Sequence, residues 1–144
     1  MHRMINKRKD ESGFTLIELL VVVVIIGVLV AIAVPVYLNY RQGAADKSAQ
    51  SDVRGAISAM EQYYTENGNA YPTSPTGVQS ATFNLGSSTL KVTMSDKSKL
   101  NFIAAGSTYT VCAKNDDGNK FYRYRSSQGG SIEQLSALTL ATCA

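Results

Sequence analysis

With 144 residues and a formal net charge of +3, the chain has room for one modest domain. Residues 1–13 hold four Lys or Arg and two acidic residues, so residues 14–144 are nearly neutral, with ten Lys or Arg against nine Asp or Glu. This balance argues against a general nucleic-acid surface, which needs a strong basic patch.

Few side chains of this sequence suit catalysis or metal binding. The single histidine is His2, so a histidine-dependent triad cannot be built in the rest of the chain. Cys112 and Cys143 form no Cys-x-x-Cys pair, and a zinc site would lack soft ligands. A disulfide, which needs an oxidising compartment, is the simpler interpretation, and two buried free thiols are the alternative. We therefore expect that the protein is not an enzyme and that it binds neither a cofactor nor a metal ion.

The first predicted element is one helix from near Phe14 to Glu66. Its first part, residues 14–40, is mostly apolar, and residues 14–38 alone would extend roughly 37 Å as a helix, enough to span a bilayer. The basic residues before it predict a cytoplasmic N-terminus, with Arg41 onward outside. A secretory signal peptide has similar charges, but this run is long and lacks a small-x-small cleavage site at its end.

Glu18, Gly27 and Pro35 stand out within the mostly apolar residues 14–40. Glu18 places a carboxylate in this segment, where an uncompensated charge near the bilayer centre costs roughly 2.5–3.5 kcal/mol, so we expect it to have a partner. Gly27 and Pro35 are weak points of the helix. Because Pro35 removes a backbone donor and crowds the preceding turn, a kink or local unwinding is predicted between them.

Residues 41–68 are predicted to form the amphipathic half of the same helix. Its apolar residues recur at steps of three and four: Ala45, Ala49, Val53, Ala56, Ile57, Met60 and Tyr64. Its charged residues largely occupy the other faces: Asp46, Lys47, Asp52, Arg54, Glu61 and Glu66. Asn67-Gly68 supplies the helix end, since glycine tolerates the left-handed conformation found there.

Residues 69–144 differ in composition: they are rich in Ser, Thr and Gly and contain short runs of residues that favour β-strands. Strands are predicted at 90–94, 109–113 and 121–125, and residues 72–88 are interpreted as connection. Between the last two strands, Asn115–Asn119 contains Asp-Gly and predicts an antiparallel hairpin with a primed turn. The predicted fold class is α+β, with a long N-terminal helix packed on a small antiparallel sheet.

The N-terminal motif carries a family resemblance. Residues 13–18 (GFTLIE), followed by an apolar helix with glycine at 27 and proline at 35, resemble the N-terminus of type IV pilins and pseudopilins over about residues 13–41. The resemblance implies a leader, residues 1–13, that prepilin peptidase removes by cutting between Gly13 and Phe14. It also implies N-methylation of the new Phe14 amine.

The resemblance also implies a partner for Glu18, namely the Phe14 amine of a neighbouring subunit entering a filament. A weaker local alternative is that Glu18 favours the helix N-terminus through the macrodipole, for about 0.3–1 kcal/mol. Cys112 and Cys143 resemble the cysteines of the C-terminal disulfide that many pilins carry.

At the level of function, the resemblance implies a structural subunit of an extracellular type IV pilus that supports adhesion, motility or DNA uptake. The implied partners are other copies in a helical filament, the peptidase and methyltransferase, a platform protein, membrane lipid before assembly, and a surface or DNA ligand. The sequence has no Gly-rich phosphate loop, so the assembly ATPase is expected to be a separate protein. Alternatives are a major pseudopilin of a type II secretion-like system, a minor competence pilin that binds DNA, and a simple single-pass anchored protein.

Two features of the C-terminal half resemble binding sites. Asp116, Asp117 and Asn119 could ligate calcium, as in some major pseudopilins, but they are also the residues that a tight turn prefers. Arg123 and Arg125 alternate with aromatic residues as in some nucleic-acid strands, although alternation is more simply that of a half-buried strand. In both cases the structural interpretation is preferred.

Overall fold

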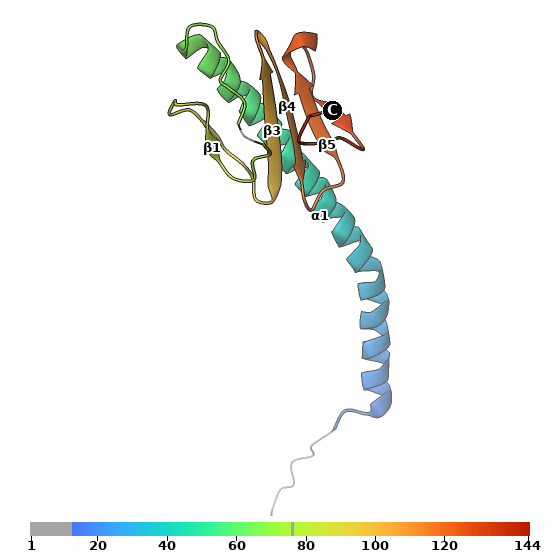
Figure 1. The fold of residues 1–144 in the computed structure, drawn as a ribbon. Coiled ribbons are helices and arrows are strands. Elements are labelled where there is room, and N and C mark those ends of the chain that lie inside the picture. The colour runs from blue at the N-terminus through green and yellow to red at the C-terminus, as the bar shows by residue number, and fades with distance from the viewer. Residues whose placement is uncertain (1–12, 76) are drawn as a thin grey trace, which may run out of the picture. The chain divides into compact units, whose positions relative to one another are not determined.

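The computed structural model describes residues 13–75 and 77–144, so the expected leader lies, except for Gly13, outside the described residues. The α+β prediction is confirmed (Figure 1). The elements are α1 (Leu16–Glu66), β1 (Phe83–Asn84), β2 (Lys91–Val92), β3 (Ser98–Ala105), β4 (Thr108–Asn115), β5 (Phe121–Arg125), a 3₁₀ turn at Ser126–Gln128, and β6 (Glu133–Leu135). The chain divides after Tyr37 into two compact units.

The first unit contains the apolar part of α1, and its side chains are exposed from Phe14 to Tyr37. In the part of the chain that the structure describes, α1 is the one helix whose length and composition suit a membrane span. The backbone is helical at both Gly27 and Pro35. The kink or unwinding between them therefore remains a prediction.

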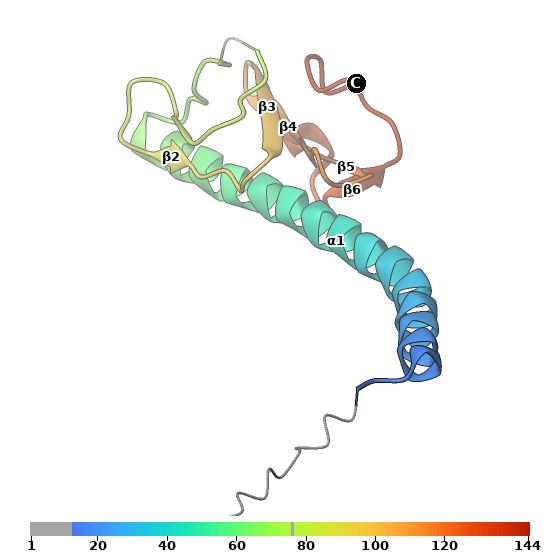
Figure 2. The same ribbon diagram turned by 90° about the horizontal axis from the view of Figure 1, so that it is seen from below.

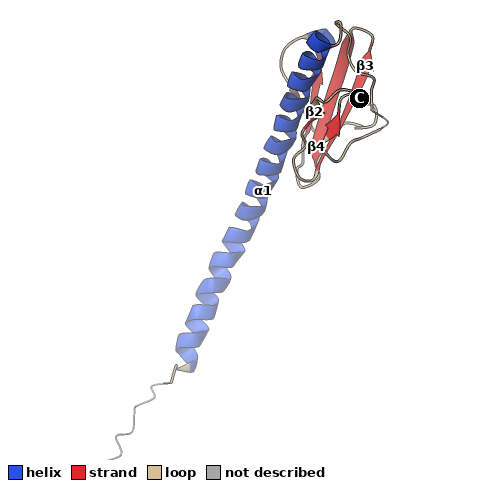
Figure 3. Cartoon of the chain, turned by 90° about the vertical axis from the view of Figure 1, so that its left-hand side faces the viewer, coloured by secondary structure: helices blue, strands red, loops and turns tan. Residues whose placement is uncertain are grey.

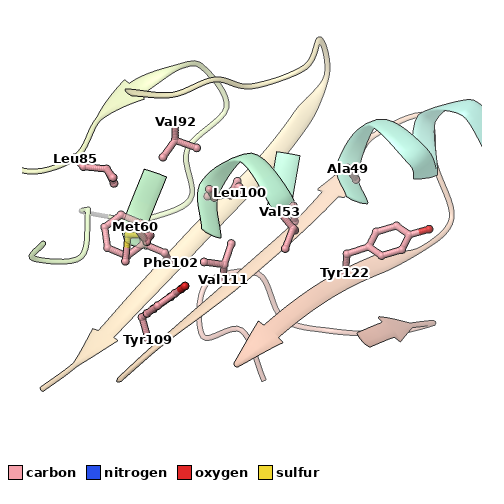
Figure 4. Packing of buried hydrophobic residues seen from close by; sticks show 12 residues of the cluster. Ala49, Val53, Met60, Leu85, Val92, Leu100, Phe102, Tyr109, Val111 and Tyr122 are labelled. Atoms are coloured by element: carbon pink, nitrogen blue, oxygen red, sulfur yellow. The ribbon is translucent and has the colours of Figure 1, made fainter. Parts of the chain in front are cut away.

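The second unit, Leu38–Ala144, packs the outer part of α1 against a four-stranded antiparallel sheet in the order β3-β4-β5-β6. The four-stranded sheet lies along one side of α1 (Figures 2 and 3). The core between them contains Ala49, Val53, Ala56, Met60, Leu85, Val92, Leu100, Phe102, Tyr109, Val111, Ala113 and Tyr122 (Figure 4). The helical spacing of the apolar residues therefore identified the face of α1 that the sheet covers.

The strands match the sequence predictions in part. Residues 109–113 lie within β4, residues 121–125 are β5, and the two strands pair antiparallel with Lys114 opposite Phe121. The predicted strand at 90–94 is reduced to β2, which pairs with β1 inside the segment interpreted as connection. Strands β3 and β6 were not predicted, because buried polar residues in β3 (Ser98 and Asn101) and the three-residue length of β6 hide the apolar pattern.

The hairpin between β4 and β5 is present, but its primed turn was a wrong prediction. A primed turn needs positive φ, and no residue from Asn115 to Lys120 has it. The turn instead closes through a bond from Gly118 N to Asn115 O of 3.0 Å and one from Asp117 N to the Asn115 side chain of 3.0 Å. Gly118 is needed for another reason, since a Cβ there would overlap Oδ1 of Asp46.

Two carboxylates that were placed on the polar faces of α1 are buried and hold loops against the helix. Asp46 Oδ1 accepts hydrogen bonds from the backbone N–H groups of Asn119 and Lys120, both at 2.9 Å. Asp52 Oδ1 accepts bonds from the Ser95 N–H at 3.1 Å and the Ser95 hydroxyl at 2.8 Å. Two donors at Oδ1 offset part of the cost of burying each carboxylate, although Oδ2 of Asp52 is buried without a hydrogen-bond partner among the described residues.

Gly118 provides a test of this docking. Gly118→Ala is expected to lower the free energy of unfolding by about 1–3 kcal/mol, because the new methyl group forces the turn away from Asp46. Gly55→Ala is the matched control, since a Cβ at that exposed helical position meets no atom within 4 Å. Urea unfolding of the full chain in detergent, followed by circular dichroism, measures both variants. Equal stability of Gly118→Ala and wild type would contradict the tight contact.

The C-terminal segment is fastened to the sheet by a disulfide and by polar contacts. Cys112 in β4 and Cys143 are joined, with their Cα atoms 5.6 Å apart. The buried Asn101 side chain donates to the Leu140 and Ala141 carbonyls, both at 3.0 Å. The last turn of the chain is thereby held against the strands on the side of the sheet away from the α1 core.

Candidate assembly site

The candidate site lies where α1 begins, and its geometry is a capping box. Thr15 precedes the helix, and its hydroxyl accepts a hydrogen bond from the Glu18 N–H at 3.3 Å. Glu18 Oε2 in turn accepts bonds from the Thr15 N–H at 2.9 Å and the Thr15 hydroxyl at 2.8 Å. The arrangement satisfies backbone donors that the first turn of a helix leaves unpaired.

The local alternative for Glu18 thus has a geometric basis within the single chain. Both hydrogen bonds that the Glu18 carboxylate accepts use Oε2, and Oε1 makes no hydrogen bond within residues 13–75 and 77–144. Glu18 is exposed and flanked by the exposed side chains of Phe14, Ile17 and Val21. One carboxylate oxygen is therefore available to an external donor in an apolar setting.

Thr15 was missed by the sequence reasoning, although a signal for it was present. The spacing Thr15-Leu16-Ile17-Glu18 is the pattern Ser/Thr-x-x-Glu of a capping box directly before an apolar run. The family motif assigns a role to Glu18 and none to Thr15. In the structure the two residues are joined by hydrogen bonds.

Gly13 precedes the helix and is not required by the fold. A Cβ at this position meets no atom of the described residues within 4 Å. The described part of the chain therefore leaves room for a larger side chain there. Any requirement for glycine at this position must therefore come from a molecule that acts on the chain.

In the turn that could ligate calcium, the acidic side chains of Asp116 and Asp117 are paired with cations. Asp117 accepts bonds from Lys97 at 2.8 Å and Arg41 at 3.2 Å, and Asp116 lies 3.0 Å from Lys99. The hydrogen bond from Lys97 lowers the pKa of Asp117, and the same bond raises the pKa of Lys97. Within the described ranges, no group of three or more His, Cys, Asp or Glu could hold a metal ion.

The arginines weighed for nucleic-acid binding are also engaged by an acid. Glu133 of β6 accepts bonds from Arg123 Nε at 2.9 Å and Arg125 Nη2 at 2.7 Å, and these bonds lower the pKa of Glu133. Arg123 also donates to the Cys143 carbonyl at 3.2 Å. These two cations fix β5 to β6 and to the chain end, which leaves less charge for phosphate groups.

A row of tyrosines joins the end of α1 to the sheet. Tyr64, Tyr71, Tyr109 and Tyr124 follow one another with ring centroids 4.7, 4.7 and 5.8 Å apart. The Tyr109 hydroxyl donates to Glu61 Oε1 at 2.7 Å, and burial followed by this bond raises the pKa of Tyr109. These contacts are those of packing residues, in line with the sequence interpretation of Tyr64.

Comparisons with known proteins agree with the motif at residues 13–18. Residues 8–34 match the family model described as the prokaryotic N-terminal methylation motif. The chain is 38% identical over 73 residues to the type II secretion system core protein G of Pseudomonas aeruginosa, covering 51% of each chain. It is 40% identical over 70 residues to the type IV major pilin protein PilE1 of Neisseria gonorrhoeae, covering 49% of this chain and 33% of the pilin.

A fimbrial protein of Neisseria meningitidis is 40% identical over 74 residues, covering 50% of this chain and 43% of the relative. The chain spans about half the length, or less, of the curated relatives that it matches. These relatives are structural subunits, and no catalytic family is indicated. The matched methylation motif, the exposed apolar helix and the long helix packed on an antiparallel sheet are consistent with the type IV pilin and pseudopilin superfamily, to which the N-terminal half of the chain is similar.

Proposed function

We propose that the chain is the structural subunit of an extracellular type IV pilus, polymerising through α1 after its leader is removed. The observation that carries this proposal is the methylation motif at residues 8–34, which leads into an apolar helix with no buried side chain from Phe14 to Tyr37. Such a surface costs hydrophobic free energy in water, so it needs either lipid or the apolar helices of neighbouring copies. A membrane precursor that becomes a filament subunit satisfies both requirements in turn.

In this proposal the precursor spans the inner membrane with its N-terminus in the cytoplasm. Prepilin peptidase cuts between Gly13 and Phe14, and a methyltransferase modifies the Phe14 amine, which stays basic. A platform protein and a separate ATPase drive the subunit out of the lipid. Adhesion, motility or DNA uptake would then be properties of the assembled fibre.

Glu18 is proposed to guide assembly by receiving the Phe14 amine of a neighbouring subunit. At about 4 Å and an effective dielectric near 20, such a pair is worth roughly 4 kcal/mol before the cost of desolvation. The main role of this ion pair is to set the register of the incoming subunit, because a misdocked subunit leaves a charge unpaired in apolar surroundings. The unbonded Oε1 supports this role, since Thr15 occupies only Oε2.

A second candidate is a major pseudopilin of a type II secretion system, which the matches to core protein G favour. The disulfide and the cation-paired acidic turn favour the pilin. Deleting the chain from its native host separates the two functions. We expect loss of long surface fibres with normal protein secretion, whereas secreted proteins retained in the periplasm would identify the pseudopilin.

Gly13→Leu tests the proposed processing. We expect uncleaved precursor to accumulate, because a branched side chain obstructs a peptidase site that otherwise accepts glycine, while Gly13→Ala should give an intermediate result. Gly27→Leu is the matched control, since a Cβ at Gly27 likewise meets no atom and the residue lies away from the cut. Immunoblotting of membrane fractions measures the ratio of precursor to mature chain. Normal maturation of Gly13→Leu would show that the cut lies elsewhere.

A further inference from the structure

The outer part of α1 carries an exposed row of side chains that the sheet does not cover. Tyr40, Lys47, Arg54 and Glu61 follow one another at intervals of seven residues, and all four are exposed. Seven residues fall about 20° short of two helical turns, so the four lie along one gently winding line. We call this row the stem seam. None of the four belongs to the core face of α1, which is formed by Ala49, Val53, Ala56 and Met60.

The space along the stem seam is open to a neighbouring helix. Small exposed residues, Gly43, Ser51 and Ser58, lie between its long side chains, and a Cβ at Gly43 would meet no atom within 4 Å. Small residues in such a line let two helix backbones approach closely. The cations Lys47 and Arg54 form no ion pair within the described residues.

Glu61 is the acidic end of the stem seam, and its position is fixed. Both of its hydrogen bonds, from Tyr109 at 2.7 Å and Tyr71 at 3.4 Å, are accepted by Oε1. Oε2 accepts no hydrogen bond from the described residues. Tyr71 and Tyr109 therefore hold the carboxylate by one oxygen, while the exposed residue keeps its second oxygen without a partner among the described residues.

The order of side chains along the seam decides which alignment of two parallel copies is favourable. With no offset, Lys47, Arg54 and Glu61 each face their own like charge. An offset of one seven-residue interval pairs Arg54 with Glu61 but sets Lys47 against Arg54. An offset of two intervals pairs Lys47 with Glu61 and Arg54 with Tyr40, with no like charges opposed.

We infer that the stem seam is a contact between two parallel copies of this chain, offset by fourteen residues or about 21 Å along the helix. This inference rests on the proposed filament function and adds a register to it. Because the two copies use different halves of the seam, the contact does not close into a dimer. One copy keeps Arg54 and Glu61 free and the other keeps Tyr40 and Lys47 free, so each can bind a further copy, as a filament requires.

A zero-length carbodiimide cross-link tests the contact in purified filaments. We expect mass spectrometry to find an amide between Lys47 and Glu61 that is absent from unassembled chain in detergent. The two residues lie about 21 Å apart on one helix, so the bond cannot form within a chain. The ion pairs of Lys97 with Asp117 and Lys99 with Asp116, at 2.8 and 3.0 Å, supply positive controls within the chain.

Filaments that show the two control links without the link from Lys47 to Glu61 would overturn the seam contact and leave the proposed function standing. Absence of any filament would overturn both. Charge reversal gives an independent measure: Lys47→Glu should reduce filament recovery at least fivefold, and adding Glu61→Lys should restore it in part. Lys91→Glu, at an exposed cation of β2 outside the stem seam, is the matched control and should assemble normally. Equal recovery for Lys47→Glu and Lys91→Glu would contradict the inference.

Discussion

Replacing Glu18 with alanine is expected to leave membrane insertion and cleavage intact while reducing filament recovery at least tenfold. In the proposed filament, the alanine leaves the Phe14 amine of the incoming subunit without a counter-charge. An unpaired charge in an apolar setting costs several kcal/mol, and a tenfold effect needs only about 1.4 kcal/mol. The measurement is the amount of chain in the sheared extracellular fraction relative to the mature chain in the membrane.

Two further variants separate this role from the capping box. Glu18→Gln keeps an acceptor for the Thr15 groups but removes the charge, so it should fail to assemble nearly as severely as alanine. Thr15→Ala removes the cap and keeps the charge, at a cost of about 1 kcal/mol in helix stability, and should still form filaments. If Thr15→Ala failed and Glu18→Gln assembled, the local role would account for Glu18 and the intersubunit role would be wrong.

Removing the disulfide is expected to have the largest effect on the stability of the second unit, Leu38–Ala144. The bond closes a loop over a separation of 31 residues, and the chain-entropy model gives a loss of about 3–4 kcal/mol for such a loop. The double variant Cys112→Ser with Cys143→Ser should therefore unfold at a lower urea concentration than wild type, measured on the full chain in detergent. Asn101 retains its bonds to the last turn in this variant.

Reduction of the wild-type chain supplies the control for the disulfide prediction. A reducing agent should shift the unfolding midpoint of wild type to that of the double variant and leave the variant unchanged. Equal midpoints for oxidised wild type and the variant would show that the covalent link adds nothing to the polar contacts of the C-terminal segment.

The parts of the fold that follow from local pattern could be predicted from the sequence. The apolar residues at three- and four-residue steps identified the buried face of α1, and Gly68 marked its end, with φ of 66°. Strand β5 and the hairpin before it followed from alternation and the turn residues. Each of these features depends on residues close together in the chain.

The features that were missed depend on partners far away in the sequence. The sequence predicts that Asp46 and Asp52 are exposed to solvent. It does not reveal their hydrogen-bond donors, Asn119, Lys120 and Ser95, because these lie 43 to 74 residues away. Gly118 was assigned to a primed turn, although its real constraint is the Asp46 side chain. Burial of polar side chains by distant loops leaves no periodic signal.

The candidate site likewise has one feature that is local in the sequence and one that depends on a distant partner. The pairing of Thr15 with Glu18 is local, and its spacing was readable in the sequence. The pairing of Glu18 with the Phe14 amine of another subunit involves a second chain, so neither the sequence nor the fold of one chain can supply its geometry. It remains a prediction that rests on the motif and on the unbonded carboxylate oxygen.

Intact-mass spectrometry of chains sheared from the outside of expressing cells, with and without reduction, tests the central claim most directly. The account predicts a chain that begins at N-methylated Phe14 and gains two mass units on reduction as the bond between Cys112 and Cys143 opens. Finding only the full-length chain, confined to the membrane fraction, would contradict it and would leave a simple anchored protein.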